Sequence, residues 1–335
     1  MPTTCSFIGG EAVASTDTYD NIDPSTGEVL GAVGRGGATE VDRAVSAARS
    51  ANREWRRTSP EHRADLLCKL GDLIAADREN LAVLESEDTG KPLTQARTDA
   101  DVCARYFRFY GRAIDSYYGI SIPLRSDLHV YTRREPFGVT GHIVAWNYPM
   151  QLLARGVAPA IATGNCSIVK PADETPRSAV RVAELAIQAG IPAGVFNVVT
   201  GLGAEAGAAL TSHPGVDHIG FVGSTEVGSI IARSAADRTA PVVLELGGKS
   251  AQIVFADANL ETASRFITKA ILQNAGQTCS AGSRLLVHES VHDDLIARVA
   301  ALFAQVTIGR GRDDRDLGPL VSLKQQARVR GYVDG

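Results

Sequence analysis

The fold is decided by residues 139–246, whose short β-rich runs read VTGHIVA (139–145), CSIVK (166–170), VFNVV (195–199), HIGFV (218–222) and VVLEL (242–246). The segments between these runs have helical spacing, as in residues 176–189, which Gly190 follows as a helix stop signal. Short β-rich runs that alternate with helices are typical of a parallel sheet with helices on both faces. The sequence therefore predicts an α/β fold.

The residues before this region predict an extended segment followed by helices. Residues 1–37 are rich in turns, above all at Asp23-Pro24-Ser25-Thr26-Gly27, which separates short β-like runs. Thr39 and Asp42 have the spacing of a capping box, and Ser59 precedes a proline, as an N-cap residue does. We expect helices from Thr39, from Ser59-Pro60, over 79–88 before Gly90, and from about 95 to 116.

The segments 119–137 and 247–335 depart from these patterns. Residues 129–132 (HVYT) alternate in polarity, which predicts a β-hairpin within 119–137. After residue 246 the alternation of strands and helices starts again, but a parallel strand needs neighbours on both sides, so we expect an incomplete α/β unit there. Its predicted strands are 251–255 and 284–288, and its predicted helices are about 259–275, 290–305 and 322–332.

Composition and charge exclude several classes of protein. The chain of 335 residues is 44% hydrophobic and 21% charged, as folded globular chains are. Its 34 Lys and Arg residues against 38 Asp and Glu residues give a net charge of −4, which argues against a nucleic-acid partner. No apolar run approaches the ~20 residues of a membrane helix, and no secretory signal is visible, so we expect no membrane partner.

The cysteines and histidines favour a reducing compartment without a metal site. The five cysteines, at positions 5, 68, 103, 166 and 279, are scattered and odd in number, which fits the cytoplasm rather than a disulfide framework. His213 and His218 lack a Cys or carboxylate partner at ligand spacing. We therefore expect a cytoplasmic protein that binds no metal.

Four polar or glycine-rich segments lie near predicted strand ends, where parallel sheets bind ligands. Residues 146–149 (WNYP) and 170–173 (KPAD) also have ordinary explanations, as a turn and a solvated loop. Residues 223–228 (GSTEVG) are predicted to begin a helix, where free main-chain N–H groups can bind a phosphate. The ordinary explanation is that the Ser or Thr side chain caps this helix. The fourth segment pairs residues 245–249 (ELGGK) with 276–280 (GQTCS), whose lone Cys is either a reactive thiol or a buried structural residue.

Taken together, these segments resemble the NAD(P)-dependent aldehyde dehydrogenase superfamily and occur in its order. LELGGKS (244–250) and GQTCSAGSR (276–284) are specific to it, as are the 34 positions from Glu245 to Cys279 (279 − 245) and the 23 from Asn147 to Lys170 (170 − 147). The resemblance covers residues 1–335 and is to non-phosphorylating members that hydrolyse an acyl-enzyme. It implies a Rossmann-like NAD-binding domain (1–118 and 138–246), an oligomerisation hairpin (119–137) and a partial catalytic α/β domain (247–335).

The resemblance implies an activity, the NAD-dependent oxidation of an aldehyde to a carboxylic acid. Cys279 resembles the nucleophile, because thiolates attack carbonyls readily and thioesters remain hydrolysable. Asn147 resembles the oxyanion donor, with the Cys279 N–H beside it, and Glu245 resembles the general base for water. CoA-acylating relatives usually lack this Glu, so we expect the free acid as product.

The resemblance also implies a set of cofactor-binding residues. Lys170 resembles the residue that binds the adenosine ribose, and Asp173 stands where the family commonly has Glu. A carboxylate there accepts a bond from a 2′-hydroxyl and repels a 2′-phosphate, so we expect NAD rather than NADP. Ser224 resembles a pyrophosphate contact. The remaining cofactor positions are Ile143, Val144, Trp146, Gly203, Gly207, Gly223, Val227 and Leu246.

Arg155 and Tyr148 are candidates for substrate contact. Arg155 follows Asn147 by about two helical turns, at a position that lines the substrate tunnel in several relatives. Many members carry Trp there, whereas the succinate-semialdehyde type carries Arg, whose guanidinium suits a substrate carboxylate. The ordinary explanation is a surface residue in an Arg-rich chain. Tyr148 is the neighbour of Asn147.

Family members are usually longer than this chain. In those longer members, the part that corresponds to positions beyond 335 includes an E-I-F-G-P segment, whose Glu holds the nicotinamide ribose. It also includes the rest of the catalytic domain and an arm that completes the sheet of the oligomer. Two alternatives to the hydrolytic enzyme therefore stay open: a catalytically incomplete NAD-binding fragment, and a CoA-acylating or acyl-phosphate-forming relative. We expect a homo-oligomer in the full-length family form.

Overall fold

The computed structural model describes residues 3–335 and contains one large sheet with the strand order β11-β10-β7-β8-β9-β1-β2. The strands from β11 to β9 in this order are parallel, so the predicted α/β fold is confirmed. The N-terminal strands β1 (Ser6–Ile8) and β2 (Glu11–Val13) add an antiparallel edge that the sequence did not predict. The parallel strands are β7 (Val139–Ile143), β8 (Cys166–Lys170), β9 (Phe196–Val198), β10 (His218–Val222) and β11 (Val242–Glu245).

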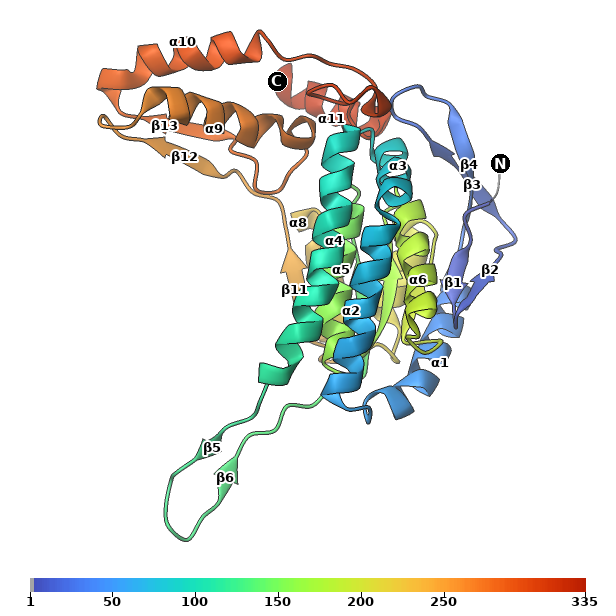
Figure 1. Ribbon diagram of the computed structural model, residues 1–335. Helices are drawn as coiled ribbons and strands as arrows, with labels where there is room; N and C mark the ends of the chain where they lie inside the picture. The colour runs from blue at the N-terminus through green and yellow to red at the C-terminus, as the bar shows by residue number, and fades with distance from the viewer. Residues whose placement is uncertain (1–2) are drawn as a thin grey trace.

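Helices pack against both faces of this sheet (Figure 1). On one face, α5 (Pro149–Ala162) and α6 (Arg177–Ala189) connect successive parallel strands. After β9 the chain returns past β7 to β10, so it now crosses the sheet in the opposite direction. A right-handed crossover in this direction places α7 (Ala208–Ser212) on the opposite face of the sheet. There α7 contacts α1 (Ala38–Trp55) and α8 (Thr225–Ala236). Outside α5 and α6 lie α2 (Pro60–Ala76), α3 (Arg78–Thr89) and α4 (Leu93–Ala113).

The strand order reverses between β7 and β10, which makes this pair the switch point of the sheet. Ligands of open α/β sheets bind at the carboxyl ends of the strands beside such a point. A cavity of about 210 Å³ lies there, lined by residues of β7, β10, β11 and α5. The candidate residues 143–155, 170–173, 223–227 and 245–246 all follow strands of this sheet and so gather at the same edge.

Three of the four predicted helix signals are confirmed, including Gly190, which ends α6 with φ 97°. The Ser59 hydroxyl accepts the His62 N–H at 3.2 Å, so Ser59 is the N-cap of α2. Gly90 ends α3 with φ 76°, in the left-handed region. The predicted capping box at Thr39 is wrong, because α1 begins one residue earlier and the Glu40 carboxylate accepts the Gly37 N–H at 2.8 Å.

The predicted hairpin at 119–137 is present and projects from the body of the molecule (Figure 1). It consists of the short antiparallel strands β5 (Ser121–Ile122) and β6 (Val130–Tyr131), which follow η1 (Ile114–Ser116). A second small antiparallel pair, β3 (Thr18–Ile22) and β4 (Val29–Gly34), flanks the predicted turn at 23–27.

The residues after 246 form a small unit around a parallel pair, β12 (Ala251–Val254) and β13 (Arg284–Val287). Its core is a separate hydrophobic cluster of Val254, Ile267, Leu295 and Val299. The predicted helix 259–275 ends earlier, at Leu272. The helical segments are α9 (Leu260–Leu272), η3 (Gln273–Gly276), η4 (Glu289–Val291), α10 (His292–Phe303), η5 (Gly311–Asp313) and α11 (Leu323–Val333).

Candidate active site

Two segments that lie far apart in the chain meet at the N-terminus of α5. Pro149 occupies the first helical position, so Asn147 and Tyr148 are held in the turn that precedes the helix. The Asn147 Nδ2 donates to the Gln277 carbonyl at 2.8 Å, and the Tyr148 hydroxyl lies 2.8 Å from the Thr278 hydroxyl. The structure thus places Asn147 and Tyr148 beside the turn that carries Cys279.

Cys279 lies in an exposed turn, unlike the thiols of the core. Cys103 and Cys166 are buried, and burial raises the pKa of both thiols, which keeps them protonated. The main-chain N–H of Cys279 has no acceptor among residues 3–335. Gly248 approaches closely, since a Cβ at that position would lie 3.2 Å from the Cys279 carbonyl oxygen. The result is an accessible thiol beside an unpaired N–H donor.

The backbone just before this turn is left-handed at three successive residues. Asn274, Ala275 and Gly276 have φ values of 50°, 54° and 75°. For a non-glycine residue this conformation costs about 1–2 kcal/mol, so tertiary contacts must stabilise it. The Asn274 Nδ2 donates to the Asn147 carbonyl at 2.9 Å, and the Asn274 N–H donates to Gln95 Oε1 at 3.1 Å. These bonds connect the strained turn to α4 and to the start of α5.

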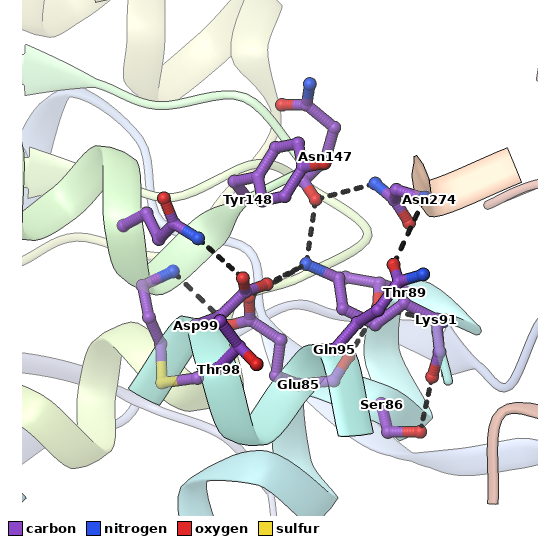
Figure 2. Close-up of polar contacts among 12 residues, drawn as sticks. Glu85, Ser86, Thr89, Lys91, Gln95, Thr98, Asp99, Asn147, Tyr148 and Asn274 are labelled. Atoms are coloured by element: carbon purple, nitrogen blue, oxygen red, sulfur yellow. Dashed lines mark hydrogen bonds and ion pairs between the residues drawn. The ribbon is translucent and has the colours of Figure 1, made fainter. Parts of the chain in front are cut away.

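A buried lysine that the sequence analysis missed holds the main-chain carbonyl of Asn147 (Figure 2). The Lys91 ammonium donates to this carbonyl at 2.9 Å and pairs with Glu85, at 3.1 Å, and with Asp99. A signal was available, because Glu85 continues the buried face of α3 at helical spacing from Leu81. A carboxylate at a core position requires a charged or hydrogen-bonding partner.

Glu245, the last residue of β11, faces Arg155 on α5. The Arg155 Nη2 lies 3.4 Å from Glu245 Oε2, and the side chains are 40% and 54% exposed. Both line the cavity at the switch point together with Ile143 and Val144. Ion pairs this exposed contribute only ~0–1 kcal/mol, so this pair separates at little cost.

Lys170, Asp173 and Gly203 are brought together at the ends of β8 and β9. Lys170 is buried and its ammonium pairs with Asp173, whose second oxygen accepts the Gly203 N–H at 3.3 Å. A Cβ on Gly203 would lie 3.9 Å from the Lys170 Nζ, so this glycine borders the pair closely. The Val144 N–H donates to the Lys170 carbonyl at 3.1 Å, which couples this group to β7.

The predicted pyrophosphate position lies at the N-terminus of α8. The Ser224 hydroxyl accepts the Val227 N–H at 3.3 Å, the ordinary N-cap explanation. The Gly223 N–H donates to the Glu245 carbonyl at 3.0 Å, so this turn adjoins the end of β11. Val227 is 42% exposed and therefore accessible to a ligand.

Three further predicted cofactor positions line the same edge of the sheet. A Cβ on Gly207 would lie 3.8 Å from Ile143 Cδ1, so these two residues adjoin across the π-helical turn η2 (Gly203–Gly207). Leu246 packs against Gly228 on α8, where a Cβ would lie 2.8 Å from its side chain. Trp146 is partly buried.

Within residues 3–335, no group of three or more His, Cys, Asp or Glu side chains could hold a metal ion. The fold brings one carboxylate to His213 from far along the chain, since its Nε2 lies 3.3 Å from Asp42. In the same part of the chain, no helix is long and apolar enough to cross a membrane.

Known proteins match this chain in sequence and in structure. A curated hydroxyisobutyraldehyde dehydrogenase of Mycolicibacterium austroafricanum is 44% identical over 331 residues, which are 98% of this chain and 66% of that protein. The NAD+ complex of an aldehyde dehydrogenase from Bacillus cereus has a TM-score of 0.97 and 40% identity over 99% of this chain and 69% of its own. An NADP-dependent enzyme of E. coli has a TM-score of 0.97 and 35% identity over 99% and 70%.

This chain thus spans 66% of the length of the curated relative and 69–70% of these two solved structures. The resemblance carried by the Asn147, Lys170, Glu245 and Cys279 segments is confirmed at the level of the family. The sequence model that describes the aldehyde dehydrogenase family matches residues 12–335, so the chain belongs to that family.

Proposed function

We propose that this chain binds NAD and carries the nucleophile of an enzyme that oxidises an aldehyde to a carboxylic acid. One observation carries the proposal: the Asn147 carboxamide is hydrogen-bonded directly to the segment that holds the exposed Cys279 thiol. A thiol with amide donors beside it can attack a carbonyl and stabilise the oxyanion that forms.

In the proposed reaction, the Cys279 sulfur adds to the aldehyde carbon and forms a thiohemiacetal. The Asn147 Nδ2 has two hydrogens, of which the Gln277 carbonyl accepts one, so the other is free for the substrate oxygen. The unpaired Cys279 N–H is the second donor. NAD, when bound, supplies the hydride acceptor that oxidation of this adduct to a thioester requires.

The residues at the sheet edge suit an NAD molecule. In the Lys170–Asp173 pair, the Asp173 side chain is 37% exposed, so its carboxylate can accept hydrogen bonds from ribose hydroxyls, with the buried Lys170 ammonium beside it. Asp173 would repel a 2′-phosphate, which supports NAD over NADP. The first turn of α8 after Ser224 offers N–H groups to a pyrophosphate. NADP with a kcat/KM equal to that of NAD would contradict this assignment.

Glu245 is the proposed general base for thioester hydrolysis. Its carboxylate is accessible, and its partner Arg155 holds it only through an exposed pair. A proton acceptor in this place activates water, so the expected product is the free acid rather than acyl-CoA. Product analysis with and without CoA distinguishes the two, and acyl-CoA formation would favour the CoA-acylating alternative.

Arg155 is the proposed recognition residue for an anionic substrate group. Its guanidinium is partly exposed and borders the cavity at the switch point, so a substrate carboxylate can replace Glu245 as its partner. We expect Arg155→Leu to raise KM for aldehydes that bear a carboxylate much more than KM for plain alkanals. The name of the M. austroafricanum relative adds a hydroxyaldehyde to this panel, as the uncharged comparison.

We propose the same division of the chain as above, with 1–118 and 138–246 binding NAD, 119–137 mediating homo-oligomer formation and 247–335 belonging to the catalytic domain. The two separate hydrophobic clusters support the boundary near 246. Exposed apolar residues support a partner surface on the hairpin, including Ile120, Leu124, Leu128 and Tyr131. The scattered cysteines fit the cytoplasm.

The direct test is NADH formation by the purified chain with NAD and a panel of aliphatic, aromatic and carboxylate-bearing aldehydes. We expect activity that Cys279→Ala abolishes while NAD binding is retained. Binding of NAD without NADH formation for any aldehyde would contradict the catalytic proposal for these 335 residues and favour the NAD-binding fragment.

A further inference from the structure

We propose that Lys91 is a positioning residue: its ammonium, held between Glu85 and Asp99, fixes the Asn147 peptide so that the Asn147 carboxamide faces the Cys279 turn. This inference rests on the oxyanion role proposed above for Asn147. Lys91 itself does not face the reacting atoms, since its ammonium binds the main-chain carbonyl and not the carboxamide (Figure 2).

The Lys91 ammonium is fully committed to fixed partners. It has three hydrogens, and its three hydrogen-bond partners are Glu85 Oε1 at 3.1 Å, Asp99 and the Asn147 carbonyl at 2.9 Å. Its side chain is 0% exposed, so no water can replace a lost partner. The Tyr148 ring centroid lies 4.5 Å from the same nitrogen. Rotation of the Asn147 carbonyl would therefore leave one of the three N–H groups of a buried ammonium without an acceptor.

The two carboxylates connect this ammonium to the start of α5. Glu85 Oε2 accepts the Met150 N–H and the Ser178 hydroxyl, both at 3.2 Å. Asp99 accepts the Gln151 side-chain amide at 2.5 Å. The cluster thus joins α3 and α4 to the first turn of α5 (Figure 2). Through Ser178 it also reaches α6. Asn147, just before α5, is held by elements that pack in the main core.

The Asn147 side chain needs this support because it has little of its own. Its Oδ1 is buried and has no hydrogen-bond partner among residues 3–335. Its single bond, from Nδ2 to the Gln277 carbonyl, runs to the strained turn at 274–276. The direction of the carboxamide is therefore set by the backbone of residue 147, and that backbone is fixed through its carbonyl by Lys91 and Asn274.

The charge state of the cluster guides the choice of variants. Burial lowers the pKa of Lys91, but Asp99 and Glu85 raise it by more, so the ammonium stays charged. Burial raises the pKa of Glu85 to about 8, against the lowering effect of Lys91. The Lys91→Met/Asp99→Asn double variant removes the pair that Lys91 forms with Asp99 without a net change in charge.

The experiment measures acylation of Cys279 by p-nitrophenyl acetate, followed as the burst of p-nitrophenolate. This reaction forms a tetrahedral oxyanion at Cys279 but requires no cofactor, and Cys279→Ala gives the background. We expect Asn147→Ala to slow acylation by roughly 10²-fold, as loss of an oxyanion donor does. We expect Lys91→Met to slow it by about tenfold or more, and by less than twofold when Asn147 is already Ala, because Lys91 acts through Asn147.

Two further variants keep the test decisive. If Lys91→Met does not fold, the charge-balanced Lys91→Met/Asp99→Asn variant takes its place. The matched control, Arg177→Met/Asp88→Asn, removes another largely buried ion pair, which joins α6 to α3 with its atoms 2.5 Å apart and does not contact Asn147. We expect this control to lower the melting temperature without slowing acylation of the folded protein.

The outcomes separate the two proposals. If Lys91→Met slowed acylation by the same factor in the Asn147→Ala background as in the original chain, the positioning role would be overturned and the proposed function would stay intact. A normal acylation rate in Asn147→Ala would refute the oxyanion role and, with it, the role of Lys91. Slowing by the Arg177/Asp88 control as large as that by Lys91→Met would show a general loss of structure and also contradict the inference.

Discussion

Cys279 and the buried cysteines show how environment separates one thiol from another. Cys279 is exposed, whereas Cys103 and Cys166 are buried and have raised thiol pKa values. We expect iodoacetamide to modify Cys279 in the native chain while Cys103 and Cys166 remain unmodified, as determined by mass spectrometry of peptides. All five cysteines should react after denaturation. Native modification of Cys103 at the rate of Cys279 would contradict this prediction.

His142 on β7 gives a pH dependence of stability with a definite sign. Burial, aided by His218, lowers its pKa to about 3, against about 6.5 in an unfolded chain. Between these values the unfolded state binds the extra proton, so His142 lowers the free energy of unfolding by about 1.4 kcal/mol for each unit that pH falls below 6.5. His142→Gln should flatten the stability profile between pH 7 and 5, measured by urea unfolding. Parallel profiles would exclude this role.

At the scale of elements, Gly90 is required both by its conformation and by its neighbours. It ends α3 with φ 76°, and a Cβ there would lie 2.6 Å from Pro319 and 2.9 Å from Pro24. Gly27 has a similar φ of 75° but no atom within 4 Å of such a Cβ. We expect both Ala variants to lose about 1–2 kcal/mol of the free energy of unfolding because of their left-handed backbone. Gly90→Ala should lose about 1–3 kcal/mol more because its Cβ overpacks the two prolines. Thermal unfolding tests this difference; equal melting temperatures would contradict it.

The hairpin β5–β6 is an element with several largely exposed apolar side chains. Ile120 and Tyr131 are 62% and 65% exposed. If they lie in an interface between copies, Ile120→Asp with Tyr131→Asp should lower the mass found by light scattering. Phe266→Asp, at a residue 68% exposed on α9, is the matched control and should leave it unchanged. An oligomer whose mass is unchanged by the two hairpin substitutions would refute the oligomerisation proposal.

At the scale of the whole molecule, the two hydrophobic clusters differ greatly in size. The larger includes residues of the seven-stranded sheet and of α1 to α8, whereas the smaller consists of four buried residues with a few partners. Regions with few buried apolar contacts open at lower free energy. We therefore expect amide hydrogens of β12, α9 and α10 to exchange faster than those of α2 and α4. Hydrogen exchange with mass spectrometry measures this, and equal protection would indicate a single cooperative unit.

The sequence by itself determined most of the local structure of this protein. The runs at 139–246 predicted every parallel strand of the large sheet, because alternating β-rich and helical segments leave few other arrangements. The Ser59-Pro60 and Gly90 signals identified helix ends correctly, since capping depends on residues that are adjacent in the chain. The Asn147, Lys170, Glu245 and Cys279 segments identified the family.

Only the tertiary structure decided which of these groups touch. It added β1 and β2 to the sheet, paired Arg155 with Glu245 and placed Lys91, Glu85 and Asp99 behind Asn147. Lys91 and Asn147 are 56 positions apart, and no local preference records such a pair. Their contact exists because α3, α4 and α5 pack together and exclude water, which leaves a buried ammonium no partners except the carboxylates and the one carbonyl that the fold brings to it.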